Sequence, residues 1–175
     1  TAAYSSIEDI SERIVPVPLV ESSLDIGALL SRLSSYTIKN QEDWDWMNPS
    51  LAEIVIVNDD SCNNKRIKAI DLSGFVHLKT LTICDNCFQY VNDLNMSGLK
   101  TLESVLIGKG CFTRKTGQFR IVGCPSLKEL RIGLSSFSNF VVCDIENCAL
   151  ESIEMGDRDS DSRSFYYASL EIKRE

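Results

Sequence analysis

The chain has 175 residues, 43% of them hydrophobic and 25% charged, which suits one domain with a sizeable core. Its net charge of −7 at pH 7 argues against a nucleic-acid-binding protein, because phosphate binding needs clustered Lys and Arg. No stretch approaches the roughly 20 apolar residues of a membrane span, so we expect none in this chain. No signal peptide is visible, but a start at Thr1 without Met is typical of a processed fragment, so the compartment stays open.

Residues 1–50 lack the repeat that follows and are predicted to form an N-terminal cap region with a short helix. Ser5 and Glu8 have the spacing of a capping box, which indicates a helix start. A second, amphipathic helix is expected over residues 24–33, and a short strand over residues 36–38.

Both tryptophans, Trp44 and Trp46, lie near the end of this region. The end of a stacked repeat array exposes apolar core and needs covering. We therefore expect the two indole rings to cap the first repeat. The alternative is an exposed aromatic hot spot for a partner.

From residue 51 onward one apolar pattern recurs: an apolar residue, two variable positions, an apolar residue, one variable position and an apolar residue. The five copies are Leu51–Ile54–Ile56, Leu78–Leu81–Ile83, Leu102–Val105–Ile107, Leu127–Leu130–Ile132 and Leu150–Ile153–Met155. Their leading residues lie 27, 24, 25 and 23 positions apart. A unit of this size cannot enclose a core of its own, so the copies must stack as a solenoid and share one.

Each copy after the first is preceded by a second apolar pair with a spacing of two, which places both side chains on one face of a strand. The pairs are Ile70/Leu72, Leu94/Met96, Phe119/Ile121 and Cys143/Ile145, and Leu170/Ile172 begins a further one. The sequence therefore predicts a β-rich solenoid of about five repeats over residues 51–175, with two short strands per coil.

A turn and then a phenylalanine follow the first strand of the coil in three copies. Phe88, Phe112 and Phe137 share one phase of the repeat and are expected to stack as an aromatic column. Glycines follow the first strand at a tight corner, where a residue without a Cβ is favoured: Gly108, Gly133 and Gly156.

This frame of LxxLxI, a phenylalanine and a Cys-containing step (VGCPSL at 122–127, ENCAL at 146–150) resembles the leucine-rich repeats. Among them it is most similar to the BspA-like type found in surface proteins of bacteria and protists, over residues 51–173. The proline that this type often carries after the first strand is replaced here by Gly or Cys. The resemblance implies partner binding without catalysis, and it favours a secreted or cell-surface location.

The seven cysteines form an odd set, which argues against a fully paired disulfide framework. Cys87 and Cys111 share one repeat position, and Cys124 and Cys148 share another within one residue. Free cysteines behave as small buried hydrophobes, so we expect buried columns. Cys84 and Cys87 form a CxxC, whose remote alternative is a metal or redox site.

A partner-binding face follows from the strand phase, because residues between the inward positions point outward. We predict this face on the first strand of each coil, with a protein ligand, or a glycan as the alternative. Its residues are Val55, Thr80, Thr82, Ser104, Leu106, Glu129, Arg131, Ser152 and Glu154. The outward column of the second strand is Asp71, Asn95, Arg120, Asp144 and Glu171. The pairs Arg131/Glu154 and Arg120/Asp144 then place opposite charges on neighbouring strands.

Other functional classes have weaker support. An enzyme would have to use the one histidine, His77, which has no evident catalytic partner. Asp157, Asp159 and Asp161 alternate but lack the Gly and Glu of a calcium loop, so we predict neither a metal site nor a cofactor. The single sequon at Asn95 is weak support for secretion. A structural or self-associating solenoid that forms a weak homodimer through its ends is the main alternative to a binding module.

Overall fold

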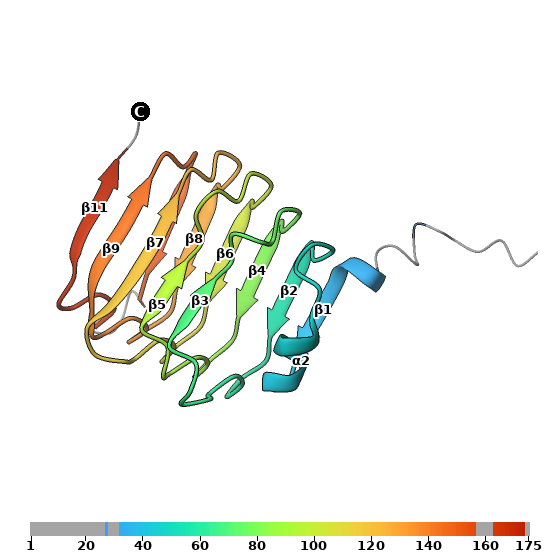
Figure 1. Cartoon of the computed structure of the whole chain (residues 1–175). Helices are drawn as coiled ribbons and strands as arrows, with labels where there is room; N and C mark the ends of the chain where they lie inside the picture. The colour runs from blue at the N-terminus through green and yellow to red at the C-terminus, as the bar shows by residue number, and fades with distance from the viewer. Residues whose placement is uncertain (1–26, 28–31, 157–162, 174–175) are drawn as a thin grey trace, which may run out of the picture.

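A computed structural model describes residue 27 and residues 32–156 and 163–173. Over these residues the chain forms a β-solenoid of about five coils with parallel strands and few helices (Figure 1). The helix start predicted at Ser5 lies outside the described residues. The helix expected over residues 24–33 lies mostly outside them, with residues 27 and 32–34 helical.

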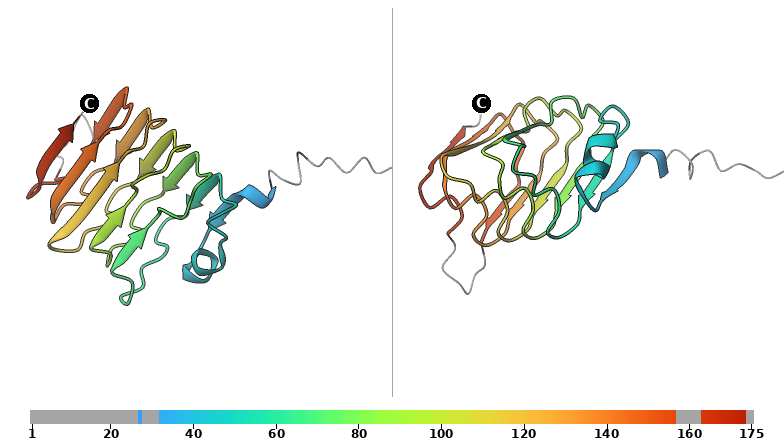
Figure 2. Two further views of the ribbon diagram at one scale, coloured as in Figure 1. Left: turned by 45° about the horizontal axis from the view of Figure 1, so that its top comes forward. Right: turned by 60° about the horizontal axis from the view of Figure 1, so that its bottom comes forward.

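Two parallel sheets enclose the core, and Figure 2 shows the coils stacked in chain order. Sheet A contains the first strand of each coil, in the order β1 (Ser35–Ile38), β2 (Ile54–Val57), β4 (Thr80–Ile83), β6 (Ser104–Ile107), β8 (Glu129–Ile132) and β10 (Ser152–Met155). Sheet B contains the second strands, in the order β3 (Ala69–Asp71), β5 (Asp93–Asn95), β7 (Gly117–Val122), β9 (Phe140–Glu146) and β11 (Ser169–Lys173). The one short helix with given bounds, α2 (Gln41–Trp46), follows β1, the strand predicted at 36–38.

The core consists of equal repeat positions stacked in register. Leu81, Val105 and Leu130 lie side by side on β4, β6 and β8, and each is at most 1% exposed. The predicted inward phase is therefore confirmed for these coils. Because every coil buries its apolar residues only against its neighbours, stability is shared along the stack.

The first copy of the repeat is displaced by one residue from the prediction. The register pairs Val55 with Leu81 and Val57 with Ile83, and both valines are fully buried. Ala52 is buried at the leading position, whereas Leu51 is half exposed. The prediction that Val55 lies on the outer face is therefore wrong. The segment 54–57 consists of four apolar β-branched residues, so both phases of the strand satisfy a period of two.

The predicted aromatic column is present and longer than expected. Phe112 stacks between Phe88 and Phe137, with ring centroids 5.5 and 4.8 Å apart. Phe165, 28 positions after Phe137 in the sequence, continues the column with its ring centroid 4.9 Å from that of Phe137. All four backbones are left-handed, with φ between 51° and 55°. The turn at each corner thus aims the ring inward at the expense of backbone strain.

The corner glycines allow consecutive coils to approach closely. A Cβ on Gly133 would lie 2.5 Å from the carbonyl carbon of Gly108, and one on Gly108 would lie 2.7 Å from that of Cys84. Gly156 instead has a φ of 78°, the left-handed region that favours glycine. The predicted need for a residue without a Cβ is confirmed, for two different physical reasons.

Candidate functional site

The outer face of sheet A carries the residues predicted to bind a partner, with Val55 excepted. On β4 to β10 the outward positions are Thr80, Thr82, Ser104, Leu106, Glu129, Arg131, Ser152 and Glu154. On β2 the outward positions are Ile54, which is 39% exposed, and Ile56, which is half-buried. The prediction of this face missed both isoleucines because of the one-residue displacement.

The outer face divides into an uncharged half and a charged half. The uncharged half crosses β1, β2, β4 and β6, and we call it the uncharged strip: Ser35, Thr37, Ile54, Ile56, Thr80, Thr82, Ser104 and Leu106. A shallow hollow of about 220 Å³ lies at its border with β8, where Leu106 and Thr82 meet Arg131. On an acidic chain such a run of aliphatic and hydroxyl side chains is a distinct surface.

The charged half is made of one ion pair within β8 and one between β8 and β10. Arg131 Nε lies 2.6 Å from Glu129 Oε1 and 3.6 Å from Glu154 Oε2, which confirms the predicted pairing with Glu154. On sheet B, Arg120 Nε lies 3.2 Å from Asp144 Oδ2, also as predicted. Exposed pairs of this kind contribute little to stability, so their main effect is to neutralise the surface locally.

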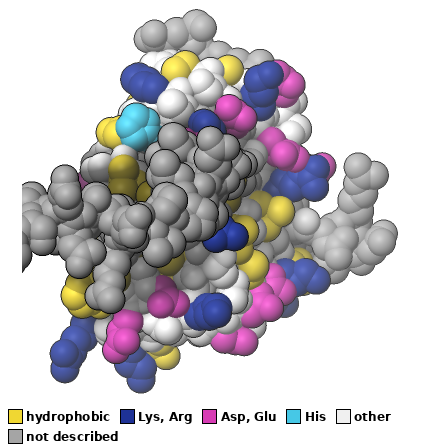
Figure 3. All heavy atoms as spheres, turned by 90° about the vertical axis from the view of Figure 1, so that its right-hand side faces the viewer, with side chains coloured by type: hydrophobic (Ala, Val, Ile, Leu, Met, Phe, Trp, Pro, Cys, Tyr) yellow, Lys and Arg dark blue, Asp and Glu magenta, His cyan; other side chains and the backbone are white. Residues whose placement is uncertain are grey.

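A second charged row, missed by the sequence reasoning, borders the same sheet. It lies one residue before each strand and alternates in sign: Glu53, Lys79, Glu103, Lys128 and Glu151. Lys79 and Glu53 are 2.8 Å apart, and Lys128 and Glu151 are 3.4 Å apart. Figure 3 shows acidic and basic side chains close together near the N-terminal end, with hydrophobic side chains between them. The alternation was visible in the sequence once Glu53 was aligned with Lys79.

No protein-family model, curated protein or solved structure matches this chain. In the described part of the chain, no helix is long and apolar enough to cross a membrane. Across residues 32–156 and 163–173, no three His, Cys, Asp or Glu side chains gather as a group that would hold a metal ion.

A column of small hydrogen-bonding side chains explains two of the cysteines. Ser61, Cys87, Cys111 and Ser136 stack at the residue before each aromatic-column position, and all are buried. The Cys111 thiol lies 3.0 Å from the Cys84 carbonyl of the previous coil, and the Ser136 hydroxyl lies 2.6 Å from that of Gly108. Serine and cysteine serve the same purpose here, because each donates to a main-chain carbonyl of the previous coil.

The CxxC pair does not converge on one site. The Cys87 thiol is buried in this column and donates to the Asn58 carbonyl at 3.0 Å, whereas Cys84 is half-buried at the end of β4. All seven cysteines are free, and the predicted second column is present, with Cys124 buried beside the half-buried Cys148. The position of Cys87 in the repeat thus accounts for the spacing of the CxxC pair.

We predict that Cys148 is the first thiol to be alkylated. Only Cys84 and Cys148 are not fully buried. A hydrogen bond from the Cys124 thiol to its sulfur lowers the pKa of Cys148 to about 7, whereas burial raises the pKa of Cys84. Since the thiolate is the nucleophile, iodoacetamide should modify Cys148 at neutral pH and Cys84 only at higher pH.

Peptide mapping by mass spectrometry across a pH series measures both rates. Cys124→Ala removes the donor, so it should move the half-maximal rate at Cys148 toward the pH of an ordinary thiol. Earlier modification of Cys84 than of Cys148 in the unaltered chain would contradict the assignment.

The remaining candidates lie apart from one another. His77 is exposed in the turn between Phe75 and Leu78. The Asn95 side chain of the sequon lies on sheet B, where it donates to Asp71 Oδ1 at 3.1 Å and accepts from the Ser97 hydroxyl at 2.6 Å. The alternating aspartates at 157, 159 and 161 lie outside the described residues.

Proposed function

We propose that this protein is an interaction module that binds a protein partner through the uncharged strip of sheet A. The observation that carries the proposal is the continuous uncharged surface across four strands of a chain with a net charge of −7. Aliphatic Ile54 and Leu106, 39% and 41% exposed, supply apolar area, and paired charges beyond Leu106 form a polar rim. Interfaces commonly have such an apolar centre with a polar border.

The resemblance to leucine-rich repeats also supports partner binding through the outer face of sheet A. Proteins of that class usually bind through the first strand of the coil, which here forms sheet A, and the BspA-like type extends the proposal to adhesion at a cell surface. A rigid solenoid also suits binding, because the outward side chains on its short parallel strands need little further ordering when a partner binds.

We infer that α2 acts as the N-terminal cap, since the ring centroid of Trp44 lies 5.0 Å from that of Phe88 and 6.2 Å from that of Phe75. The prediction that both indole rings cap the first coil is wrong for Trp46, which is 87% exposed, because residues two apart on a helix do not share a face.

The change Leu106→Glu tests the strip. We expect it to abolish partner binding while it changes the free energy of unfolding by no more than about 0.5 kcal/mol, the usual range for surface substitutions. The new carboxylate lies in register with Arg131, which offsets its cost. Thermal unfolding measures stability, and binding is followed by photo-crosslinking from position 82 in an extract of the native source.

Val141→Glu, on β9 of sheet B, is the matched control, because Val141 is 40% exposed and also changes from an aliphatic residue to an acid, and it should leave the crosslinked species unchanged. A large fall in melting temperature for Leu106→Glu would refute the outward placement of Leu106. Unchanged crosslinking with native stability would refute the binding role of the strip.

A second candidate function is self-association through the C-terminal end. Leu170 and Ile172 on β11 lie in register with the core residues Cys143 and Ile145, yet they are 50% and 45% exposed. No described strand pairs with the outer edge of β11, and α2 lies at the opposite end of the stack (Figure 1). This asymmetry favours a tail-to-tail dimer over a filament.

Sedimentation over a wide concentration range tests this candidate. We expect the mass to rise from monomer to dimer, and we expect the double change Leu170→Lys with Ile172→Lys to keep the protein monomeric. Val76→Lys, at an exposed apolar position in a turn of another coil, is the control. A mass that stays monomeric at every concentration would exclude this function.

A further inference from the structure

A groove at one corner of the solenoid is separate from both surfaces described above. It lies where the chain passes from the aromatic column to sheet B, and it has a volume of about 760 Å³. We call it the corner groove, lined by Gln89, Tyr90, Asn92, Thr113, Arg114, Lys115, Thr116 and Asn139. Its size falls within the range of ligand pockets, about 300 to 1,000 Å³.

The groove exists because one coil has an extra residue. The registers place Asp93, Gln118 and Val142 side by side, and these follow the phenylalanines of the column by five, six and five positions. The corner at 113–116 therefore protrudes beyond its neighbours. Beneath it the Phe140 ring takes the place of a side chain at Gly117, where a Cβ would lie 2.3 Å from that ring.

Asparagines from both neighbouring coils hold the protruding corner. Asn92 Nδ2 donates to the Lys115 carbonyl at 2.9 Å, and Asn139 Nδ2 donates to the Thr113 carbonyl at 2.9 Å. The Thr116 amide donates to the Asn139 carbonyl at 3.0 Å. The walls are thus fixed through main-chain groups, so ligand binding would cost little ordering of the backbone.

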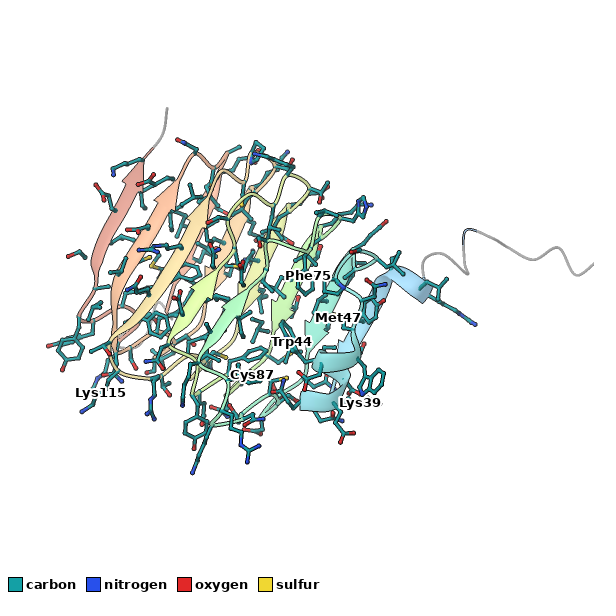
Figure 4. All side chains as sticks on the ribbon, viewed as in Figure 1. Lys39, Trp44, Met47, Phe75, Cys87 and Lys115 are labelled. Carbon is teal, nitrogen blue, oxygen red and sulfur yellow. The ribbon has the colours of Figure 1, made fainter. Side chains whose placement is uncertain are left out.

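Several polar side chains face solvent in this fixed frame. Within the described part of the chain, the side chains of Gln89, Arg114 and Lys115 have no ion-pair or hydrogen-bond partner. Tyr90 supplies an aromatic ring, with Lys65 Nζ 5.4 Å from its centroid. Figure 4 shows Lys115 on the same lower edge of the molecule as Lys39 but at the other end of the stack. Lys65, from the basic run at 65–68, thus lies beside Tyr90 at the edge of the groove.

The groove is basic, although the protein as a whole is acidic. No carboxylate is among the described residues that line it. Amide and hydroxyl groups can donate to and accept from the adjacent hydroxyls of a sugar, an aromatic ring can pack on its apolar face, and Arg114 can bind a carboxylate or sulfate through two parallel hydrogen bonds. From this combination we propose that the corner groove binds an acidic oligosaccharide.

Isothermal titration with a panel of oligomers of matched length tests the proposal on the full chain. The acidic saccharides are an oligogalacturonate, which carries carboxylates, and a heparin-derived oligosaccharide, which carries sulfates. The comparison ligands are maltohexaose, poly-glutamate and an oligothymidylate. We expect one or both acidic saccharides to bind more tightly than all three comparison ligands, and the tighter of the two identifies the acidic group.

Three variants locate the site. Arg114→Gln with Lys115→Gln should weaken binding of the acidic saccharide at least about tenfold, because charge-assisted hydrogen bonds are lost. Lys39→Gln with Lys100→Gln makes the same change in net charge outside the groove and should have little effect. Tyr90→Ala should also weaken saccharide binding, because the ring that packs on the sugar is lost. Thermal unfolding shows whether each variant keeps its fold.

Each other outcome overturns the proposal. Absence of saccharide binding, or equal binding of maltohexaose, would exclude an acidic saccharide as the ligand. Equal binding of poly-glutamate or of the oligothymidylate would show that charge alone is recognised. Unchanged affinity in a folded Arg114→Gln, Lys115→Gln variant would place the site elsewhere.

Discussion

Leu130→Asp is expected to unfold the C-terminal part of the solenoid. Leu130 is fully buried on β8, in register with Val105 on one side and Ile153 on the other. An aspartate there loses the apolar contacts and places an unpaired carboxylate in the shared core. We expect the free energy of unfolding to fall by more than about 4 kcal/mol, a large part of the stability of an ordinary domain. Ile132→Asp, two residues along the same strand, should act in the same way.

Urea unfolding followed by circular dichroism measures the loss, and hydrogen exchange locates it. Because each coil contacts only its neighbours, protection should disappear first around β6, β8 and β10 and persist longer near β2. Leu106→Glu is the matched control, since it changes a leucine to an acid on the adjacent strand but at an outward position. A native unfolding midpoint for Leu130→Asp would show that the inward phase of β8 is wrong.

The inward position of Val55 in the first coil can be tested in the same way. Val55 is fully buried and its neighbour Ile54 is 39% exposed, so Val55→Asp should be much more destabilising than Ile54→Asp. The opposite order would restore the original phase. The two substitutions are adjacent in sequence, so local propensity differs little and only the direction of the side chain separates them.

The repeat could be predicted from the sequence because several patterns agreed. Leucines at a spacing of 23 to 25 residues, paired apolar residues with period two and a phenylalanine at one phase all indicated the same coil. The prediction for the first coil was wrong because Ile54 to Val57 are all apolar and β-branched, so the period alone did not show which residues face inward. Alignment of Glu53 with Lys79 would have shown that Val55 and Val57 face inward.

The surfaces were harder to predict than the core. Outward positions on β4 to β10 followed directly from the strand period, and so did the Arg131 and Arg120 ion pairs. The corner groove was not predicted, because it depends on one additional residue between Phe112 and Gln118 and on where Asn92 and Asn139 are placed by their own coils. Loop geometry of this kind depends on contacts between distant residues, which a short sequence period does not encode.

Phe112→Ala is the second substitution with a large expected effect. Phe112 is fully buried between Phe88 and Phe137 and meets the edge of Phe140 at 6.4 Å. Truncation leaves a cavity in the middle of the aromatic column, which typically costs about 3 to 5 kcal/mol. Tyr166→Ala, at a residue that is 69% exposed, is the control and should change stability little.

The left-handed backbone at this position allows a sharper comparison. Phe112 has a φ of 54°, which costs a residue with a Cβ about 1 to 2 kcal/mol and costs glycine almost nothing. We therefore expect Phe112→Gly to be at least as stable as Phe112→Ala, although glycine leaves the larger cavity. At a position with the negative φ of an ordinary β-strand, the alanine variant would be the more stable of the two. Urea unfolding of both variants measures the difference, and a clearly less stable glycine variant would show that position 112 does not carry the backbone strain. The aromatic column would then be held by its ring contacts alone.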